Sequence, residues 1–114
     1  TSGTTGKPKG VLIEHANLNN YLHYAQRNYF AEEVQGALFT NYTFDLTITT
    51  IFGVMMSGGT LTIYAGDIDE TMPRIFAEES LVNFVKLTPA QLQIAHYSPN
   101  CKFKAIFHLC KMLK

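Results

Sequence analysis

The feature that most constrains how this chain folds is an alternation of short apolar runs with longer segments of helical periodicity. Runs rich in β-branched and aromatic side chains predict buried strands at residues 11–13, 37–40, 60–64, 82–87 and 103–109. Apolar residues at helical spacing predict helices at 17–29, at 45–57, from 72 onwards and at 88–95. Because short connections join strand to helix to strand, we expect an α/β fold with a mostly parallel sheet and helices on both faces.

Residues near the expected helix ends suggest where the helices begin and end. Asn17 is suited to cap the first helix, and Gly58-Gly59 to end the second. Met72-Pro73 predicts the start of the third helix, because proline suits the first helical position. Thr88-Pro89 predicts the cap and first turn of the fourth. In the second helix, the residues expected to face inward are Leu46, Ile48, Ile51, Phe52 and Met55.

The composition fits one small folded domain. At 114 residues, 46% hydrophobic and 16% charged, the chain can bury a single core and does not have the composition of a disordered protein. Its formal net charge of zero offers no basic surface to a nucleic acid or an anionic membrane. The most apolar stretch, 48–56, is interrupted and too short to cross a bilayer, and no signal-peptide pattern is present. We therefore expect a cytoplasmic protein with no nucleic-acid partner and no membrane partner.

Neither the cysteines nor the histidines are arranged as metal ligands. Cys101 and Cys110 are too few and too far apart for a zinc site or a disulfide framework, so reduced thiols are expected. The four histidines also lack the spacing of a ligand set. We expect no metal-ligating side chains in this chain.

The first ten residues, TSGTTGKPKG, combine three features that suit a loop to binding a polyphosphate. Glycines permit positive φ, so that successive backbone N–H groups can turn toward one anion. Hydroxyl groups and two lysines add donors and positive charge. The loop differs from a Walker P-loop, because only two residues separate Gly3 from Gly6 and Pro8 follows Lys7. A solvated linker is the alternative interpretation of such a composition.

Two charged residues lie where expected strands end. Asp45 follows the loop after strand 37–40, and Lys86 lies at the tail of strand 82–87. Ligands of open parallel sheets bind outside the carboxyl ends of the strands, so both residues can face one crevice. Taken singly, Asp45 could be a helix cap and Lys86 a solvated strand end. Their pairing in a chain with a phosphate-binding loop indicates a binding site.

The opening loop closely resembles the phosphate loop of the adenylate-forming superfamily, which includes acyl-CoA synthetases, luciferases and the adenylation domains of nonribosomal peptide synthetases. The resemblance extends to about residue 106 through the segments 11–17, 44–53, 57–61 and 87–89. Phe44-Asp45-Leu46-Thr47 is similar to a core motif of amino-acid adenylation domains, in which the aspartate holds the α-ammonium of the substrate. The chain is thus expected to be a partial AMP-binding domain, residues 1–114, from the large N-terminal subdomain of such an enzyme.

The resemblance implies that the parent enzyme makes an aminoacyl-AMP from ATP and an amino acid, releases pyrophosphate, and then forms a thioester on the phosphopantetheine of a carrier protein. It implies ATP and Mg²⁺ as cofactors, and peptidyl carrier and condensation domains as partners. The residues it assigns to the ATP phosphates are Thr1, Ser2, Gly3, Thr4, Thr5, Gly6 and Lys7. The residues it assigns to the substrate pocket are Asp45, Leu46, Thr49 and Lys86. The family's adenine loop, ribose-binding aspartate and catalytic lysine have no counterpart here, so we expect no catalytic residue in this fragment and no activity from it alone.

The expected substrate is aspartate (Asp) or asparagine (Asn). A buried ammonium at Lys86 would be costly beside an apolar side chain and would repel a basic one. A short acidic or amide side chain could form a charge-assisted hydrogen bond with it. The family's pocket pattern agrees, because Asp-Leu-Thr-Lys at these four positions resembles that of domains that activate Asp or Asn. The choice between the two stays open.

The sequence departs from the family pattern after about residue 107. Where the family has a Gly-Gly-Glu-type turn, this chain reads His-Leu-Cys-Lys-Met-Leu-Lys. Because the chain also begins inside the phosphate loop, we expect it to be a fragment of a longer protein. Two alternatives stay open: a fragment of an acyl-CoA synthetase-like enzyme, and a remnant with no catalytic role.

Overall fold

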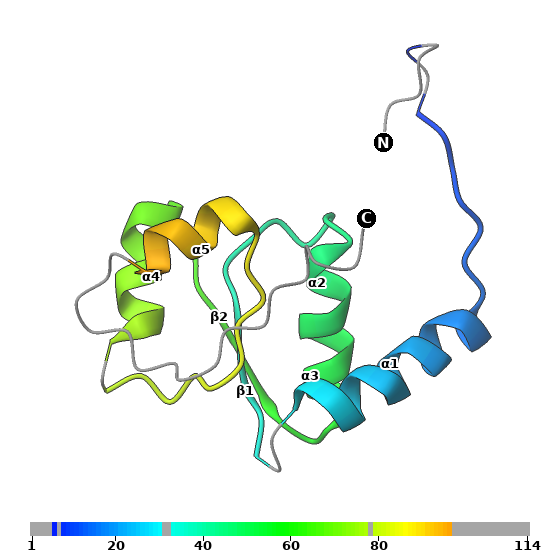
Figure 1. Cartoon of the computed structure of the whole chain (residues 1–114), viewed down its shortest axis with the longest axis horizontal. Helices are drawn as coiled ribbons and strands as arrows, with labels where there is room; N and C mark the ends of the chain where they lie inside the picture. The colour runs from blue at the N-terminus through cyan, green and yellow to red at the C-terminus, as the bar shows by residue number, and fades with distance from the viewer. Residues whose placement is uncertain (1–5, 7, 31–32, 78, 97–114) are drawn as a thin grey trace.

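The structure is a computed structural model that describes residues 6, 8–30, 33–77 and 79–96. Its elements in chain order are α1 (His15–Tyr29), β1 (Gln35–Leu38), α2 (Leu46–Ile48), the π-helical turn η1 (Thr49–Gly53), α3 (Val54–Met56), β2 (Thr60–Ile63), α4 (Ile68–Phe76) and α5 (Pro89–His96). In Figure 1, α4 and α5 lie on one side of the two strands, and α1, α2 and α3 lie on the other. The described residues thus form a mixed α/β arrangement, as expected of the fold class.

The strand β1 lies between two parallel neighbours. On one edge it pairs with β2 in the register Gln35↔Thr60 to Leu38↔Ile63. On the other edge a single parallel bridge joins Gly36 to Phe84, and the amide of Ala37 donates to the carbonyl of Phe84 at 3.2 Å. Within the described residues the regular sheet therefore has two strands. The expected strand at 82–87 is an extended segment held by this bridge, and the expected strand at 103–109 lies outside the described residues.

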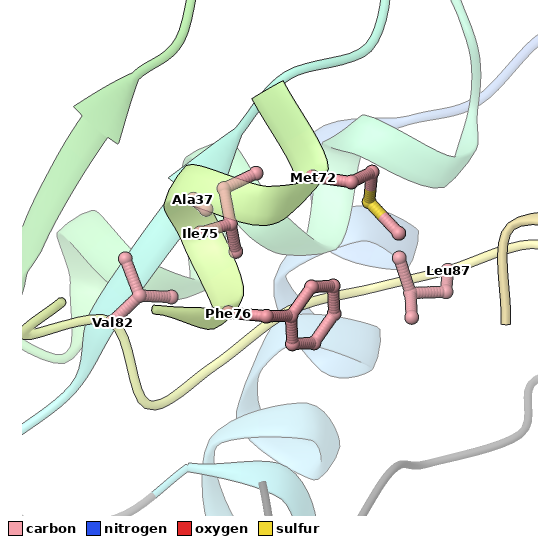
Figure 2. Close-up of a cluster of buried hydrophobic side chains, with 6 residues drawn as sticks. All are labelled: Ala37, Met72, Ile75, Phe76, Val82 and Leu87. Atoms are coloured by element: carbon pink, nitrogen blue, oxygen red, sulfur yellow. The ribbon is translucent and has the colours of Figure 1, made fainter. Parts of the chain in front are cut away.

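Two clusters of buried side chains hold the helices in place. The larger joins α4 to β1 and to the 82–87 segment, and its members are Ala37, Met72, Ile75, Phe76, Val82 and Leu87 (Figure 2). The smaller cluster is formed by Val34, Val54 and Phe84, with Phe30 and Leu61 packed against it. Because Val82, Phe84 and Leu87 belong to these clusters, the segment that carries Lys86 is anchored by apolar packing on both sides of that residue.

The expected start of the first helix is wrong by a few residues. The N-cap of α1 is Glu14, and Asn17 lies at the third helical position. The amide of Glu14 donates to Asn17 Oδ1 at 3.1 Å, so Asn17 reaches back to the cap as the partner in a capping box. The polar side chain thus does stabilise the helix start, but from inside the helix.

Residues 46–56 form one continuous helical run, as expected, with the π-helical turn η1 in its middle. The expected inward face is wrong for Ile48, Phe52 and Met55, which are exposed, whereas Leu46 and Ile51 are half-buried. The residues of this run that are buried instead include Thr47, Thr50 and Val54. Apolar residues lie on both faces of this run, so the periodicity did not single out the buried one. Gly58, with φ of 67°, ends the run by donating to the carbonyl of Met55 at 3.1 Å, which confirms the expected C-terminus.

The expected start of the third helix and the expected strand at 11–13 are wrong, whereas the expected start of the fourth helix is confirmed. The helix α4 begins at Ile68, and Pro73 lies inside it, because Asp67 and the following acidic residues already provide a favourable start. Residues 11–13 form no strand and are exposed, because no described strand lies beside them to pair with. The start of α5 is as expected: Thr88 Oγ1 accepts from the amide of Gln91 at 3.3 Å. No helix in the described ranges is long and apolar enough to cross a membrane.

Candidate functional site

One pocket of about 440 Å³ is lined by all four residues that the sequence assigned to the substrate: Asp45, Leu46, Thr49 and Lys86. Its remaining lining residues are Ile13, Asn17, Leu18, Tyr21 and Ile48. The volume is in the range of small-ligand pockets. The four assigned residues are thus brought together from two segments that are separated by almost forty residues in sequence.

The parallel pairing around β1 positions the two halves of this pocket. The chain leaves the carboxyl end of β1 at Leu38 and reaches Asp45 through a short loop. The neighbouring segment is parallel to β1 at Phe84 and reaches Lys86 two residues later. Both residues therefore follow parallel segments at the same end, where ligands of such sheets bind.

Side-chain hydrogen bonds hold the loop that precedes Asp45. Asn41 Oδ1 accepts from the amide and the hydroxyl of Thr43 at 3.0 and 2.9 Å. The buried hydroxyl of Thr47 donates to the carbonyls of Tyr42 and Phe44. Asp45 occupies the N-cap position of α2, but its side chain makes no capping hydrogen bond. Hydrogen bonds therefore fix the loop that carries Asp45, and its exposed carboxylate lines the pocket without capping the helix.

Lys86 is buried, with 8% of its surface exposed, so it is not a solvated strand end. Its Nζ donates to Thr49 Oγ1 at 2.6 Å, and Thr49 is itself 1% exposed. Within the described residues no carboxylate forms an ion pair with this ammonium. Since an ammonium carries three N–H donors, two of them are not directed to the described part of the protein.

Burial lowers the pKa of Lys86 below its usual value, because desolvation disfavours the charged form. The negative charge of Asp45 acts in the opposite direction and favours the ammonium. A negatively charged ligand group in the pocket would, like Asp45, favour the charged form of Lys86. The pocket thus contains a cationic group that is incompletely solvated and incompletely paired.

Tyr21 is a pocket residue that the sequence analysis missed. Its hydroxyl lies 2.7 Å from Thr49 Oγ1, across 28 residues of sequence. Tyr21 lies within the first expected helix, 17–29, and is half-buried in the structure. The hydroxyl of Tyr21 could have indicated a polar contact in the fold, because a buried phenol usually finds a hydrogen-bond partner.

The loop expected to bind phosphates is only partly described. Thr1, Ser2, Gly3, Thr4, Thr5 and Lys7 lie outside the described residues. Gly6 is exposed and has φ of 72°, a conformation that favours glycine. Among the described residues no cluster of three or more histidine, cysteine or acidic side chains is placed to bind a metal ion.

Comparison with known proteins identifies relatives for nearly the whole chain. The profile of the family described as AMP-binding enzyme matches residues 1–108. A mycosubtilin synthase component from Bacillus subtilis is 43% identical over 108 residues, which are 91% of this chain and 4% of the relative. Tyrocidine synthase 3 from Brevibacillus parabrevis is 37% identical over 98 residues, 85% of this chain and 2% of the relative.

A third relative is much shorter than the synthases. D-alanine–D-alanyl carrier protein ligase from Lacticaseibacillus rhamnosus is 36% identical over 106 residues, 90% of this chain and 21% of the relative. The chain thus spans only a small part of the curated relatives that it matches. No solved structure matches it.

Proposed function

The chain belongs to the AMP-binding enzyme family, and from this premise we propose that it is part of an amino-acid-activating adenylation domain of a nonribosomal peptide synthetase. The expected resemblance to this family is confirmed by the family profile and by the peptide synthases among its relatives. The proposal that the substrate is an amino acid rests on one observation, the pocket in which Asp45, Thr49 and Lys86 meet. Its chemistry suits an amino acid with a short polar side chain.

The proposed reaction is attack of the amino-acid carboxylate on the α-phosphorus of ATP, with pyrophosphate leaving. Thr4, Thr5 and Lys7 would contact the β- and γ-phosphates within the loop Thr1–Lys7, and stabilise charge that develops on the leaving group. Mg²⁺ would supply further positive charge to these phosphates when bound. The positive φ of Gly6 supports a loop whose backbone amides can turn toward an anion.

Asp45 is proposed to bind the α-ammonium of the substrate. Its carboxylate lines the pocket, is exposed, and makes no helix-capping bond. This role would distinguish an amino-acid-activating enzyme from an acyl-CoA synthetase-like one, whose substrates lack an α-amine. Leu46 and the other apolar side chains would exclude water around the aliphatic part of the substrate.

Lys86 is proposed to bind the side chain of Asp or Asn. Its two undirected N–H donors can form charge-assisted hydrogen bonds with a carboxylate or an amide oxygen, whereas an apolar side chain would leave them unpaired. The Thr49 hydroxyl, bonded to the ammonium at 2.6 Å, would hold it in place. Both substrates satisfy these requirements.

The second half-reaction is proposed to form a thioester on the phosphopantetheine of a peptidyl carrier domain, next to a condensation domain. The name of the D-alanine–D-alanyl carrier protein ligase supports such a step, because it describes an amino acid joined to a carrier protein. In this proposal residues 1–114 are one piece of the adenylation domain.

The proposal is tested by measuring amino-acid-dependent ATP–pyrophosphate exchange with the intact domain that contains this chain. We expect Asp or Asn to give the highest kcat/KM, and succinate, which is Asp without its α-amine, to give none above background, because Asp45 would have no cation to bind. Exchange that is equally fast with succinate would support an acyl-CoA synthetase-like enzyme. A preference for a large hydrophobic amino acid would contradict the role given to Lys86.

The lowered pKa of Lys86 predicts how selectivity changes with pH. The ammonium is present below its folded-state pKa and is lost as the pH rises through that value, which lies below the usual 10.5. The ratio of kcat/KM for Asp to kcat/KM for alanine should therefore fall as the pH rises toward 10.5, since kcat/KM reports the free enzyme. A Lys86→Arg variant keeps its charge over this range, so its ratio should stay level. A level ratio in the wild type would contradict the prediction.

A further inference from the structure

Three polar groups from distant parts of the chain form a continuous hydrogen-bonded row on the pocket wall. The Tyr21 hydroxyl, on α1, lies 2.7 Å from Thr49 Oγ1, at the start of η1. The same oxygen lies 2.6 Å from the Nζ of Lys86. All three residues line the pocket of about 440 Å³. Only Thr49 and Lys86 were assigned to the substrate, so the role of Tyr21 is unexplained by the proposed function.

The directions of these hydrogen bonds follow from the chemistry of the groups. A protonated lysine only donates, so Thr49 Oγ1 accepts from it. A hydroxyl oxygen has one further lone pair and one proton, and Tyr21 engages one of these two. Tyr21 thereby limits the rotation of the Thr49 hydroxyl and keeps the other lone pair directed at Lys86. Without it, that hydroxyl could rotate and place its proton toward the ammonium.

Close packing of α1 and Phe30 against η1 holds Tyr21 in this place independently of any ligand. The ring of Phe30, just after α1, approaches Gly53 so closely that a Cβ on Gly53 would lie 2.5 Å from Phe30 Cζ. Gly53 is the last residue of η1, and Thr49 is its first. Buried neighbours of Tyr21 on the same helix, Leu22 and Ala25, anchor α1 further. The phenol is therefore held by the fold itself and is available to orient Thr49 before a substrate binds.

We propose that Tyr21 is a positioning residue, which orients the Lys86 ammonium through the Thr49 hydroxyl and so strengthens the selection of a polar substrate side chain. The nature of the selected side chain rests on the proposed function, whereas the coupling of Tyr21 to Lys86 rests on the hydrogen-bonded row alone. Tyr21 touches no reacting atom in this proposal. Its effect reaches the substrate only through Thr49 and Lys86.

The test is a double-mutant cycle in the intact domain, measured by ATP–pyrophosphate exchange with the amino acid that the wild type prefers. Tyr21→Phe keeps the ring and removes only the hydroxyl, so kcat/KM should fall about 3- to 10-fold, mainly through a higher KM. The same substitution should change kcat/KM less than about 2-fold in a Lys86→Met background and in a Thr49→Val background.

The matched control is Tyr24→Phe, which removes a hydroxyl from the same helix at a residue that is 50% exposed and does not line the pocket. It should leave kcat/KM unchanged.

The outcomes separate this inference from the proposed function. An equal loss from Tyr21→Phe in all backgrounds, or one matched by Tyr24→Phe, would overturn the positioning role, since a structural effect does not depend on Lys86. A coupled loss supports the role whichever amino acid is preferred. The wild-type preference itself tests the proposed function: a hydrophobic preference would reject Asp and Asn while the cycle still reports the coupling. Thermal unfolding of each variant shows whether a loss comes from the fold.

Discussion

Replacing Lys86 with methionine in the intact domain is expected to lower kcat/KM for Asp or Asn by about 100-fold, as is usual when one partner of a buried charged hydrogen bond is removed. The reason is that the substrate carboxylate or amide would enter a pocket of largely apolar side chains and lose its cationic partner. Methionine is unbranched and similar in length to lysine, so the pocket should keep its shape. The measurement is ATP–pyrophosphate exchange over a range of amino-acid concentrations.

A matched control removes a positive charge elsewhere. Arg27 lies in the last turn of α1 and is exposed, so Arg27→Met should leave the exchange rate close to that of the wild type. The Lys86→Met variant should also gain activity with an apolar amino acid such as 2-aminobutyrate, because no unpaired ammonium would remain in the pocket. If Lys86→Met activates Asp and Asn as well as the wild type does, Lys86 does not bind the substrate.

The largest expected loss of stability comes from Phe76→Ala. Phe76 is 1% exposed and packs in the cluster that joins α4, β1 and the 82–87 segment (Figure 2). Removing a buried aromatic ring leaves a cavity as well as losing its transfer free energy, so the free energy of unfolding should fall by about 4 kcal/mol. The same cluster anchors Val82 and Leu87 on either side of Lys86, so the pocket should loosen too. Urea unfolding of the intact domain gives the change in free energy.

Phe44→Ala is the control for this second prediction. It removes the same ring at a position that is 60% exposed, so the free energy of unfolding should change by less than about 1 kcal/mol. Equal losses of unfolding free energy in the two variants would show that the cluster around Phe76 does not form the core of this region. A stable Phe76→Ala variant with a lower exchange rate would mean that Phe76 positions the pocket without carrying the fold.

The pocket depends on contacts that reach across most of the described chain. Asp45 and Thr49 come from the segment after β1, Lys86 from the segment bridged to the other edge, and Tyr21 from α1. Each of the three parts is anchored by its own packing: a hydrogen-bonded loop, an apolar cluster and a close approach at Gly53. Such preorganisation lowers the conformational entropy that the pocket residues lose when a ligand binds.

The local pattern of the sequence was enough to locate most of the described secondary structure. The helices at 46–56 and from Pro89, and the strands before and after the first of these helices, lie within a few residues of their expected positions. They could be predicted because apolar spacing, caps such as Thr88 and C-terminal glycines such as Gly58 act between residues that are adjacent or one turn apart. The placement of Asp45 and Lys86 at one end of parallel segments followed from the same pattern.

Only the tertiary structure decided which faces are buried and which polar groups meet. The inward face of the 46–56 helix was misassigned because both of its faces carry apolar residues, and the packing of neighbouring elements selects between them. The burial of Lys86, its bond to Thr49 and the contact of Thr49 with Tyr21 join residues 37 and 28 positions apart. Such contacts depend on the pairing of β1 with the 82–87 segment and on the close approach of Phe30 to Gly53, and no local periodicity encodes either. The sequence thus determined which groups the pocket has, and the packing of its distant segments determined how they are connected.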